Sequence, residues 1–273
     1  MKDVVIGSVY RLGWDHCKNW VNSLNRSGFE GHKVLCLFGN SPELVDRLVE
    51  NDIQVYNFRE LTPEENICAA RFSVYNTVLN DLGDVENVIA TDVTDVIFQH
   101  NPSNFFQFSE EKIIASSENI RYKDEKWGSK NLTLSFGEQT YDKLKDEVIY
   151  NAGVIAGSYN LIKELFFAIT CMCTNRNQNI EGGGGPDQAA YNVILSLLPF
   201  KEKTLFTNHN SGWACQIGTT LDPHKNYSEF NIDPSPILEN GVAVTSDGVD
   251  YFIVHQYNRN PQWKNEMDKK YAS

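Results

Sequence analysis

The first hundred residues alternate between short apolar runs and amphipathic helical patterns, and this alternation constrains the fold more than any other feature. The strand-like runs are residues 3–9, 32–39, 53–58 and 87–91. Helical periodicity marks the stretches between them, residues 14–24, 43–50 and 64–81. Because parallel strands need a crossover connection that a helix usually supplies, the pattern predicts an α/β fold: a mainly parallel sheet flanked by helices on both faces.

The rest of the chain mixes strand-like and helical stretches without a regular alternation. It predicts strands over residues 112–118, 151–157 and 251–258, and a helix over residues 160–174. Residues 119–147 are polar and aromatic with weak periodicity, which suggests a long excursion over a binding site. Gly182–Gly185 then lead into a further helix, for which Gly185 is the expected N-cap and Pro186 the first helical residue.

Charge and composition narrow the classes of function. The 273 residues carry a net charge of −12, which argues against a nucleic-acid partner, since phosphate backbones need clustered Lys and Arg. The net charge does not exclude a small anionic ligand, because such a ligand needs only a local binding site. The six cysteines form no paired C-x-x-C zinc pattern.

The N-terminus enters a strand-like run without a visible signal peptide, and no apolar stretch is long enough for a transmembrane segment. We therefore expect a cytoplasmic protein. A catalytic piece of a longer anchored protein would have the same sequence features.

Asp92 and Asp95 interrupt the fourth apolar run, in "VIATDVTDVIF". Ligands of parallel sheets bind at the carboxyl ends of strands, and Asp92 stands where the fourth strand ends. Two other D-x-x-D pairs, residues 81/84 and 247/250, fall in a helix-to-strand connection and a hairpin turn. Position therefore favours Asp92 and Asp95 as ligands of Mn²⁺ or Mg²⁺, although such aspartates also cap turns.

Three further segments carry candidate ligand-binding groups. His255 follows an apolar strand in "IVHQYN", where an imidazole would complete a metal site. Asp187 and Gln188 follow the glycine loop at a helix start, where an acidic residue is also favoured by the helix dipole alone. In "YNAGVIAG", Asn151 offers donors and acceptors, and Gly153 permits close backbone approach.

The order of these four segments resembles the GT-A glycosyltransferases, the nucleotide-diphospho-sugar transferases. "TDVTDVIFQHNP" is similar to the aspartate motif of that superfamily, and "DQAAYN" is similar to its family 8, whose members retain anomeric configuration. The resemblance spans most of the chain. It implies a GT-A type, Rossmann-like fold with one domain over residues 1–273, a nucleotide-binding half (1–100) and a half for donor sugar and acceptor (101–273).

The resemblance also implies an activity and its partners. The chain would move a sugar from a UDP- or GDP-linked nucleotide-sugar donor to a carbohydrate or other hydroxyl acceptor, with Mn²⁺ or Mg²⁺ as cofactor. Asp95 and His255 would hold the metal, and Asp92 would bind the metal or the donor's ribose. Arg71 would approach the donor sugar or diphosphate, and residues 119–147 would shape the acceptor site.

By the same resemblance, two sets of residues would contact the donor. The end of the first strand would hold the base and ribose through Ser8, Val9, Tyr10 and Arg11. The donor sugar would face Asn151, Gly153, Asp187 and Gln188. In a retaining enzyme, which the family 8 likeness favours, Gln188 or Asp187 would lie near the anomeric carbon; in an inverting one, Asp187 would be the general base.

The chain departs from the usual D-x-D spacing. Aligned on "DVIF", Asp95 matches the second aspartate, but Val93 takes the place of the first and Asp92 lies one residue earlier. On a strand this shift would turn a side chain to the other face, whereas at a turn it need not. The displaced aspartate leaves room for a catalytically silent nucleotide-sugar or carbohydrate-binding protein on the same fold. A nucleotidyltransferase is disfavoured, because "GSVYRLGWDH" lacks a glycine-rich basic signature.

Overall fold

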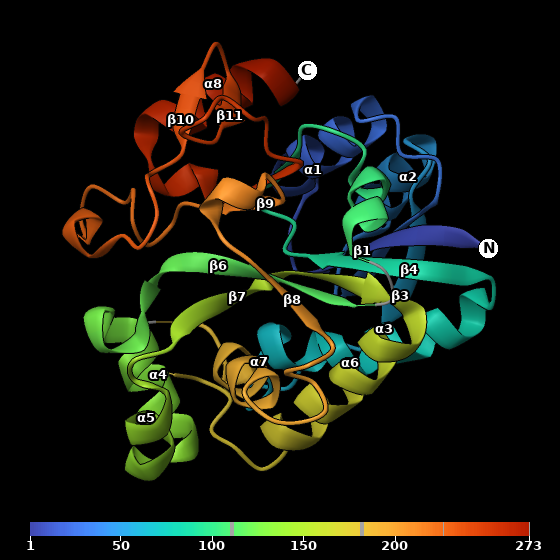
Figure 1. Cartoon of the computed structure of the whole chain (residues 1–273). Helices are drawn as coiled ribbons and strands as arrows, with labels where there is room; N and C mark the ends of the chain where they lie inside the picture. Colours follow the sequence, from blue (N-terminus) through green and yellow to red (C-terminus); the bar gives the residue numbers. More distant parts are fainter. Residues whose placement is uncertain (110–111, 181–182, 226, 273) are drawn as a thin grey trace.

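The central sheet joins both halves of the chain. A computed structural model describes residues 1–109, 112–180, 183–225 and 227–272. Seven strands lie in the order β3-β2-β1-β4-β7-β6-β8 (Figure 1). Their bounds are β1 Lys2–Tyr10, β2 His32–Phe38, β3 Gln54–Phe58, β4 Val85–Thr91, β6 Ile113–Arg121, β7 Val148–Ser158 and β8 Thr204–Thr207. β7 pairs antiparallel with β4 and β6, and the remaining pairs in this sheet are parallel. The predicted mixed, mainly parallel Rossmann-like α/β sheet is confirmed.

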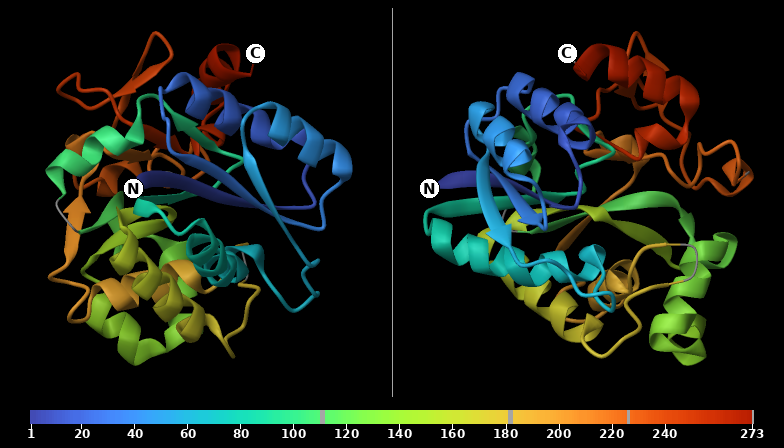
Figure 2. Two further views of the ribbon diagram at one scale, coloured as in Figure 1. Left: turned by 90° about the vertical axis from the view of Figure 1, so that its right-hand side faces the viewer. Right: turned by 180° about the vertical axis from the view of Figure 1, so that it is seen from behind.

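Helices cover both faces of this sheet (Figures 1 and 2). One face carries α1 (Trp14–Arg26) and α2 (Pro42–Glu50), and the other carries α3 (Ile67–Leu82), α6 (Tyr159–Cys173) and α7 (Asp187–Leu195). Two separate apolar clusters fill the spaces between the sheet and these helices. The remaining α-helices are α4 (Lys126–Phe136), α5 (Glu138–Leu144) and α8 (Pro261–Tyr271).

A second, three-stranded sheet stands beside the carboxyl end of β4. It consists of β5 (Val96–Phe98), β12 (Ile253–His255) and β9 (Ala214–Gln216), in the order β5-β12-β9. His255 pairs with Val96 on one side and with Gln216 on the other. This sheet therefore brings the far C-terminal part of the chain to the turn that contains Asp92 and Asp95.

Short elements complete the described chain. A hairpin joins β10 (Ile237–Glu239) to β11 (Val242–Val244). The 3-10 helices are η1 (Pro102–Phe108), η2 (Tyr122–Asp124), η3 (His209–Ser211), η4 (Ser228–Phe230) and η5 (Tyr257–Arg259). None of the helices within the described ranges combines the length and apolar character that crossing a bilayer requires.

The predicted helix starts were right at one place and wrong at two. Ser41 caps α2 by accepting from the Leu44 amide, with Pro42 next, as expected. Helix α3 begins at Ile67 and not at residue 64, because the Asn66 side chain accepts from the Cys68 amide and starts the helix there. Helix α7 begins at Asp187 with Pro186 at the N-cap, one residue later than the prediction with Gly185 as cap.

Two other predicted segments differ in structure. Residues 119–147, for which the weak periodicity predicted no helix, are mostly helical and form α4 and α5. The late strand covers only residues 253–255, since Gln256 adopts a left-handed backbone with φ of 61° and ends it. In the glycine loop, Gly182 lies outside the described residues.

Candidate functional site

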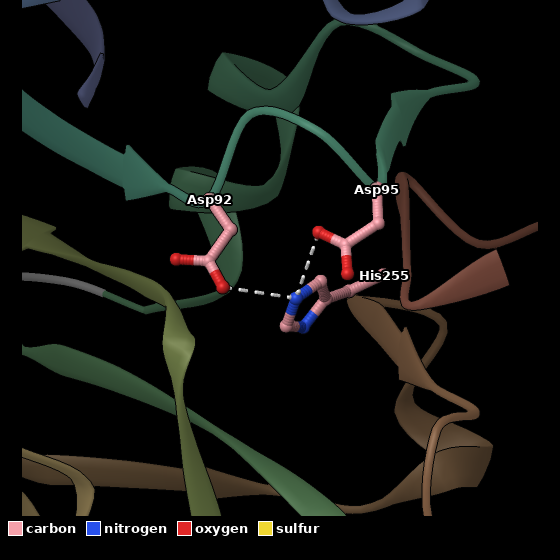
Figure 3. Close-up of side chains that lie close together, drawn as sticks. All are labelled: Asp92, Asp95 and His255. Carbon is pink, nitrogen blue, oxygen red and sulfur yellow. Dashed lines mark ion pairs between the residues drawn. The ribbon is translucent and has the colours of Figure 1, made fainter. Parts of the chain in front are cut away.

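The two aspartates stand at either end of a tight turn between β4 and β5. Asp92 follows Thr91, the last residue of β4, and Asp95 precedes Val96, the first of β5. Between them, Val93 turns inward and is only 3% exposed, packed over Gly7 of β1. A Cβ at Gly7 would lie 2.5 Å from Val93 Cγ2, so glycine is needed beneath this turn. Val93 therefore provides core packing, and both aspartates face the same side (Figure 3).

His255 faces the two carboxylates. Its Nε2 lies 3.3 Å from Asp92 Oδ2 and 3.5 Å from Asp95 Oδ1. The predicted trio thus forms a cluster whose three ligand atoms all lie within 4.8 Å of one another (Figure 3). His255 is 1% exposed, and its Nε2 has no hydrogen-bond partner of good geometry among the described residues.

Gln216 determines how the imidazole is oriented. Its Oε1 lies 2.6 Å from His255 Nδ1, and with Nδ1–H donating to this oxygen, Nε2 presents its lone pair to the carboxylates. A lone pair aimed at two anions is unfavourable unless a proton or a cation stands between them. Two carboxylate oxygens are suitable ligands for Mn²⁺ or Mg²⁺, and an imidazole nitrogen suits a transition metal, so the residues fit the predicted cofactor and fit Mn²⁺ better than Mg²⁺.

The electrostatics of the imidazole agree with this geometry. Burial by itself would lower the pKa of His255. The neighbouring Asp95 and Asp92 carboxylates outweigh burial and raise that pKa to about 9. The cluster therefore attracts positive charge, which a bound proton supplies without metal and a divalent cation would supply in its place.

Arg71, from α3, forms hydrogen bonds with one carboxylate of the cluster and with two residues beside it. Its guanidinium donates to Asp92 Oδ1, to the Ala152 carbonyl at 3.0 Å and to Asp187 Oδ2 at 3.3 Å. Burial would raise the pKa of Asp92, but Arg71 and His255 together bring it below its ordinary value. In Asp187, burial prevails over Arg71 and the pKa is raised. The two carboxylates thus differ in how readily they accept a proton.

A cavity of about 350 Å³ opens beside this cluster. Among the predicted site residues, those that line it are Arg71, Asp92, Asn151, Gly153, Asp187, Gln188 and His255. Gly153 is required there, because a Cβ would lie 2.3 Å from His255 Cε1 and 2.8 Å from Asp92 Oδ2. Asp95, the third member of the cluster, lies outside the described lining of the cavity, and its backbone carbonyl accepts from the Gln256 amide at 2.8 Å.

The predicted base and ribose site lies at the neighbouring strand end. Ser8, Val9 and Tyr10 end β1, which pairs with β4 through Gly7 and Thr91, and Arg11 follows directly. The Val9 side chain is buried in the core, Ser8 accepts from the Tyr75 hydroxyl, and Arg11 pairs with Glu60. None of these four residues belongs to the described lining of the cavity, so their role stays a prediction.

The sequence does not identify several residues that line the cavity or support the cluster beside it. Glu118 stands on β6 beneath Asn151 and Gln188, and Gln216 lies behind His255. Neither belongs to a recognisable local motif, and both are recognisable only from their partners in space. Glu125 and Trp127 also line the cavity, which places part of the 119–147 segment beside the site, as the sequence suggested.

Comparisons with known proteins do not identify the chain. No protein-family model matches it, and no curated protein matches it either. The arguments about function therefore rest on the site itself.

Proposed function

We propose that the chain is a divalent-metal-dependent glycosyltransferase that transfers a sugar from a UDP- or GDP-linked donor to an acceptor hydroxyl. One observation carries the proposal. Asp92, Asp95 and His255 converge, from segments 160 residues apart, at the carboxyl end of β4 and beside a polar cavity. This is the edge of an α/β sheet at which nucleotides and other ligands bind.

The three clustered side chains would hold Mn²⁺ or Mg²⁺. A cation bound there would neutralise the charge that develops on a departing nucleoside diphosphate. Asp92 would share its two oxygens, because Oδ1 already accepts from Arg71 while Oδ2 faces His255. Asp92 is therefore assigned both to metal binding and to orienting the guanidinium.

Asp187 and Gln188 line the cavity beyond the cluster, where the donor sugar would bind. The raised pKa of Asp187 favours a role in proton transfer, which is the role required of a general base in an inverting enzyme. The Gln188 carboxamide would lie near the anomeric carbon in a retaining enzyme. We keep both residues as the proposed catalytic groups, with retention favoured by the "DQAAYN" likeness.

The proposal is tested by metal and nucleotide binding, followed by turnover. Wild-type protein is titrated with Mn²⁺, then with UDP, GDP and their sugars in the presence of Mn²⁺, and donor hydrolysis is followed by release of nucleoside diphosphate. We expect Asp95→Ala to abolish Mn²⁺ binding and hydrolysis. The matched control is Asp247→Ala, at an exposed aspartate of another D-x-x-D pair, which should leave both unchanged.

The outcomes separate the two candidate functions. Binding with turnover supports the transferase. Nucleotide-sugar binding without turnover, over long incubation and with a panel of acceptor sugars, would favour the silent binding protein. The proposal fails if no nucleotide or nucleotide sugar binds and Asp95→Ala changes nothing.

A further inference from the structure

Glu118 is a buried carboxylate at the cavity wall, and uncharged donors from three distant segments hold it. It is 4% exposed and lines the cavity. Its Oε1 accepts from Asn151 Nδ2 at 2.7 Å and from Gln188 Nε2 at 3.0 Å, while Oε2 accepts from the Thr219 hydroxyl at 3.0 Å. These donors come from β7, α7 and the chain after β9, so Glu118 joins three parts of the site.

The hydrogen bonds from the described residues leave one position unused on the carboxylate. Each carboxylate oxygen can accept about two hydrogen bonds. The two carboxamides fill Oε1, whereas Thr219 fills only half the capacity of Oε2. A buried carboxylate oxygen gains from a second donor, because the cavity offers it less water than bulk solvent does.

The two carboxamides are themselves fixed in orientation. Asn151 Oδ1 accepts from the Gly153 amide at 2.6 Å, and Gln188 Oε1 accepts from the Ala152 amide at 3.3 Å. Each side-chain NH₂ group donates one hydrogen to Glu118 and keeps a second. Within the part of the chain that the structure describes, the cavity wall therefore combines one unused acceptor with two unused donors.

A sugar hydroxyl matches this combination, because it donates one hydrogen bond and accepts others. We propose that Glu118 is a specificity-determining residue whose Oε2 accepts a hydroxyl of the bound ligand, beside the N–H groups of Asn151 and Gln188. A ligand ammonium group fits less well, since it would meet the N–H donors of both carboxamides, and the nearby Glu125 carboxylate already accepts from the Trp127 and Gly128 amides. The inference rests on the proposed function in one respect, which is that the bound sugar is part of a nucleotide sugar.

The test replaces the acceptor with a donor of the same shape. In Glu118→Gln, the amide oxygen can stay on Asn151 and Gln188, and the NH₂ group can donate to Thr219, so the fold is retained while the free position changes from acceptor to donor. The probes are UDP, UDP-glucose, UDP-galactose, GDP and GDP-mannose with Mn²⁺, measured by calorimetry. We expect at least about a tenfold loss of affinity for the preferred nucleotide sugar and less than twofold change for its free nucleotide.

Two further variants keep the test interpretable. Glu147→Gln changes an exposed glutamate outside this cavity and should leave every affinity unchanged. Thr219→Val removes one donor to Oε2 and should give a smaller loss in the same direction, which also serves if Glu118→Gln folds poorly. The inference is overturned if Glu118→Gln weakens nucleotide and nucleotide sugar equally, or weakens neither.

A separate readout distinguishes failure of this inference from failure of the proposed function. If wild-type protein binds no nucleotide, methyl glycosides of glucose, galactose and mannose are titrated while the side-chain amide NMR signals of Asn151 and Gln188 are followed. We expect these signals to shift in wild type and not in Glu118→Gln. Unshifted wild-type signals would overturn the assignment of Glu118, whatever the nucleotide result.

Discussion

At the residue scale, close packing decides which side chains can act. Val93 occupies the place of an aspartate in the usual D-x-D spacing, yet it is buried over Gly7 and cannot reach a ligand. The turn around it lets Asp92, one position earlier, face His255 together with Asp95. The displaced aspartate thus lies in the cluster because the chain bends there instead of continuing as a strand.

Gly153 gives a direct test of this close packing. In Gly153→Ala the new methyl group would meet both His255 and Asp92, so one of them must move. We expect Mn²⁺ affinity to fall at least about tenfold and stability to fall by about 1–3 kcal/mol. Gly13→Ala is the control, because a Cβ there meets nothing within 4 Å. Equal Mn²⁺ affinity in both variants, measured by calorimetry, would contradict the assignment.

Gln216 provides a second test, through the orientation of His255. Gln216→Leu removes the oxygen that holds Nδ1, and we expect Mn²⁺ affinity to fall about 10–100-fold. Gln216→Glu keeps an acceptor oxygen at that position and should bind Mn²⁺ more tightly than Gln216→Leu does. If the two variants bind Mn²⁺ equally, as measured by calorimetry, Gln216 does not orient the imidazole.

At the scale of elements, Arg71 connects α3 to the turn after β4, to β7 and to α7. Its side chain is 7% exposed and donates to Asp92, Ala152 and Asp187, one residue on each of these three segments. The helix pattern of residues 64–81 could be recognised from sequence, but these interactions could not. They depend on which strand lies beside the helix and on the place where α7 begins.

Removing the guanidinium should therefore be costly. Arg71→Met leaves Asp92 and Asp187 without their cation, and we expect the free energy of unfolding to fall by about 3–5 kcal/mol. Arg59→Met breaks the exposed pair with Glu65 and should cost less than about 1 kcal/mol. Urea denaturation of both variants makes the comparison. Similar losses in the two would show that the buried pairs contribute no more than the surface pair.

At the scale of the whole molecule, a buried histidine sets part of the acid stability. His209 is fully buried, and neither ring nitrogen has a hydrogen-bond partner of good geometry within the described part of the chain. Burial lowers the pKa of His209 from its ordinary 6.5 to about 4, so the folded protein keeps the ring neutral. The unfolded chain, with an ordinary pKa, takes up the proton first as the pH falls.

This difference predicts a pH profile for unfolding. The stability contribution is fully present above pH 6.5 and is lost as the pH falls towards 4, by about 3 kcal/mol in total. In His209→Leu this part of the acid sensitivity should disappear, whereas His224→Leu, at an exposed turn, should retain it. Urea titrations between pH 4 and 7 measure the effect, and parallel wild-type and His209→Leu profiles would refute it.

The sequence alone determined the alternating elements, the mainly parallel sheet and the edge at which Asp92 lies, because periodicity and the alternation of strands with helices can be read along the chain. It also identified the three clustered residues, first from their positions at strand ends and then through a resemblance. It could not determine that His255 Nε2 would meet both aspartates, that Val93 would turn into the core, or that Glu118 and Gln216 would hold the site. Those facts depend on contacts between residues far apart in the chain, which arise only when two sheets pack against one another.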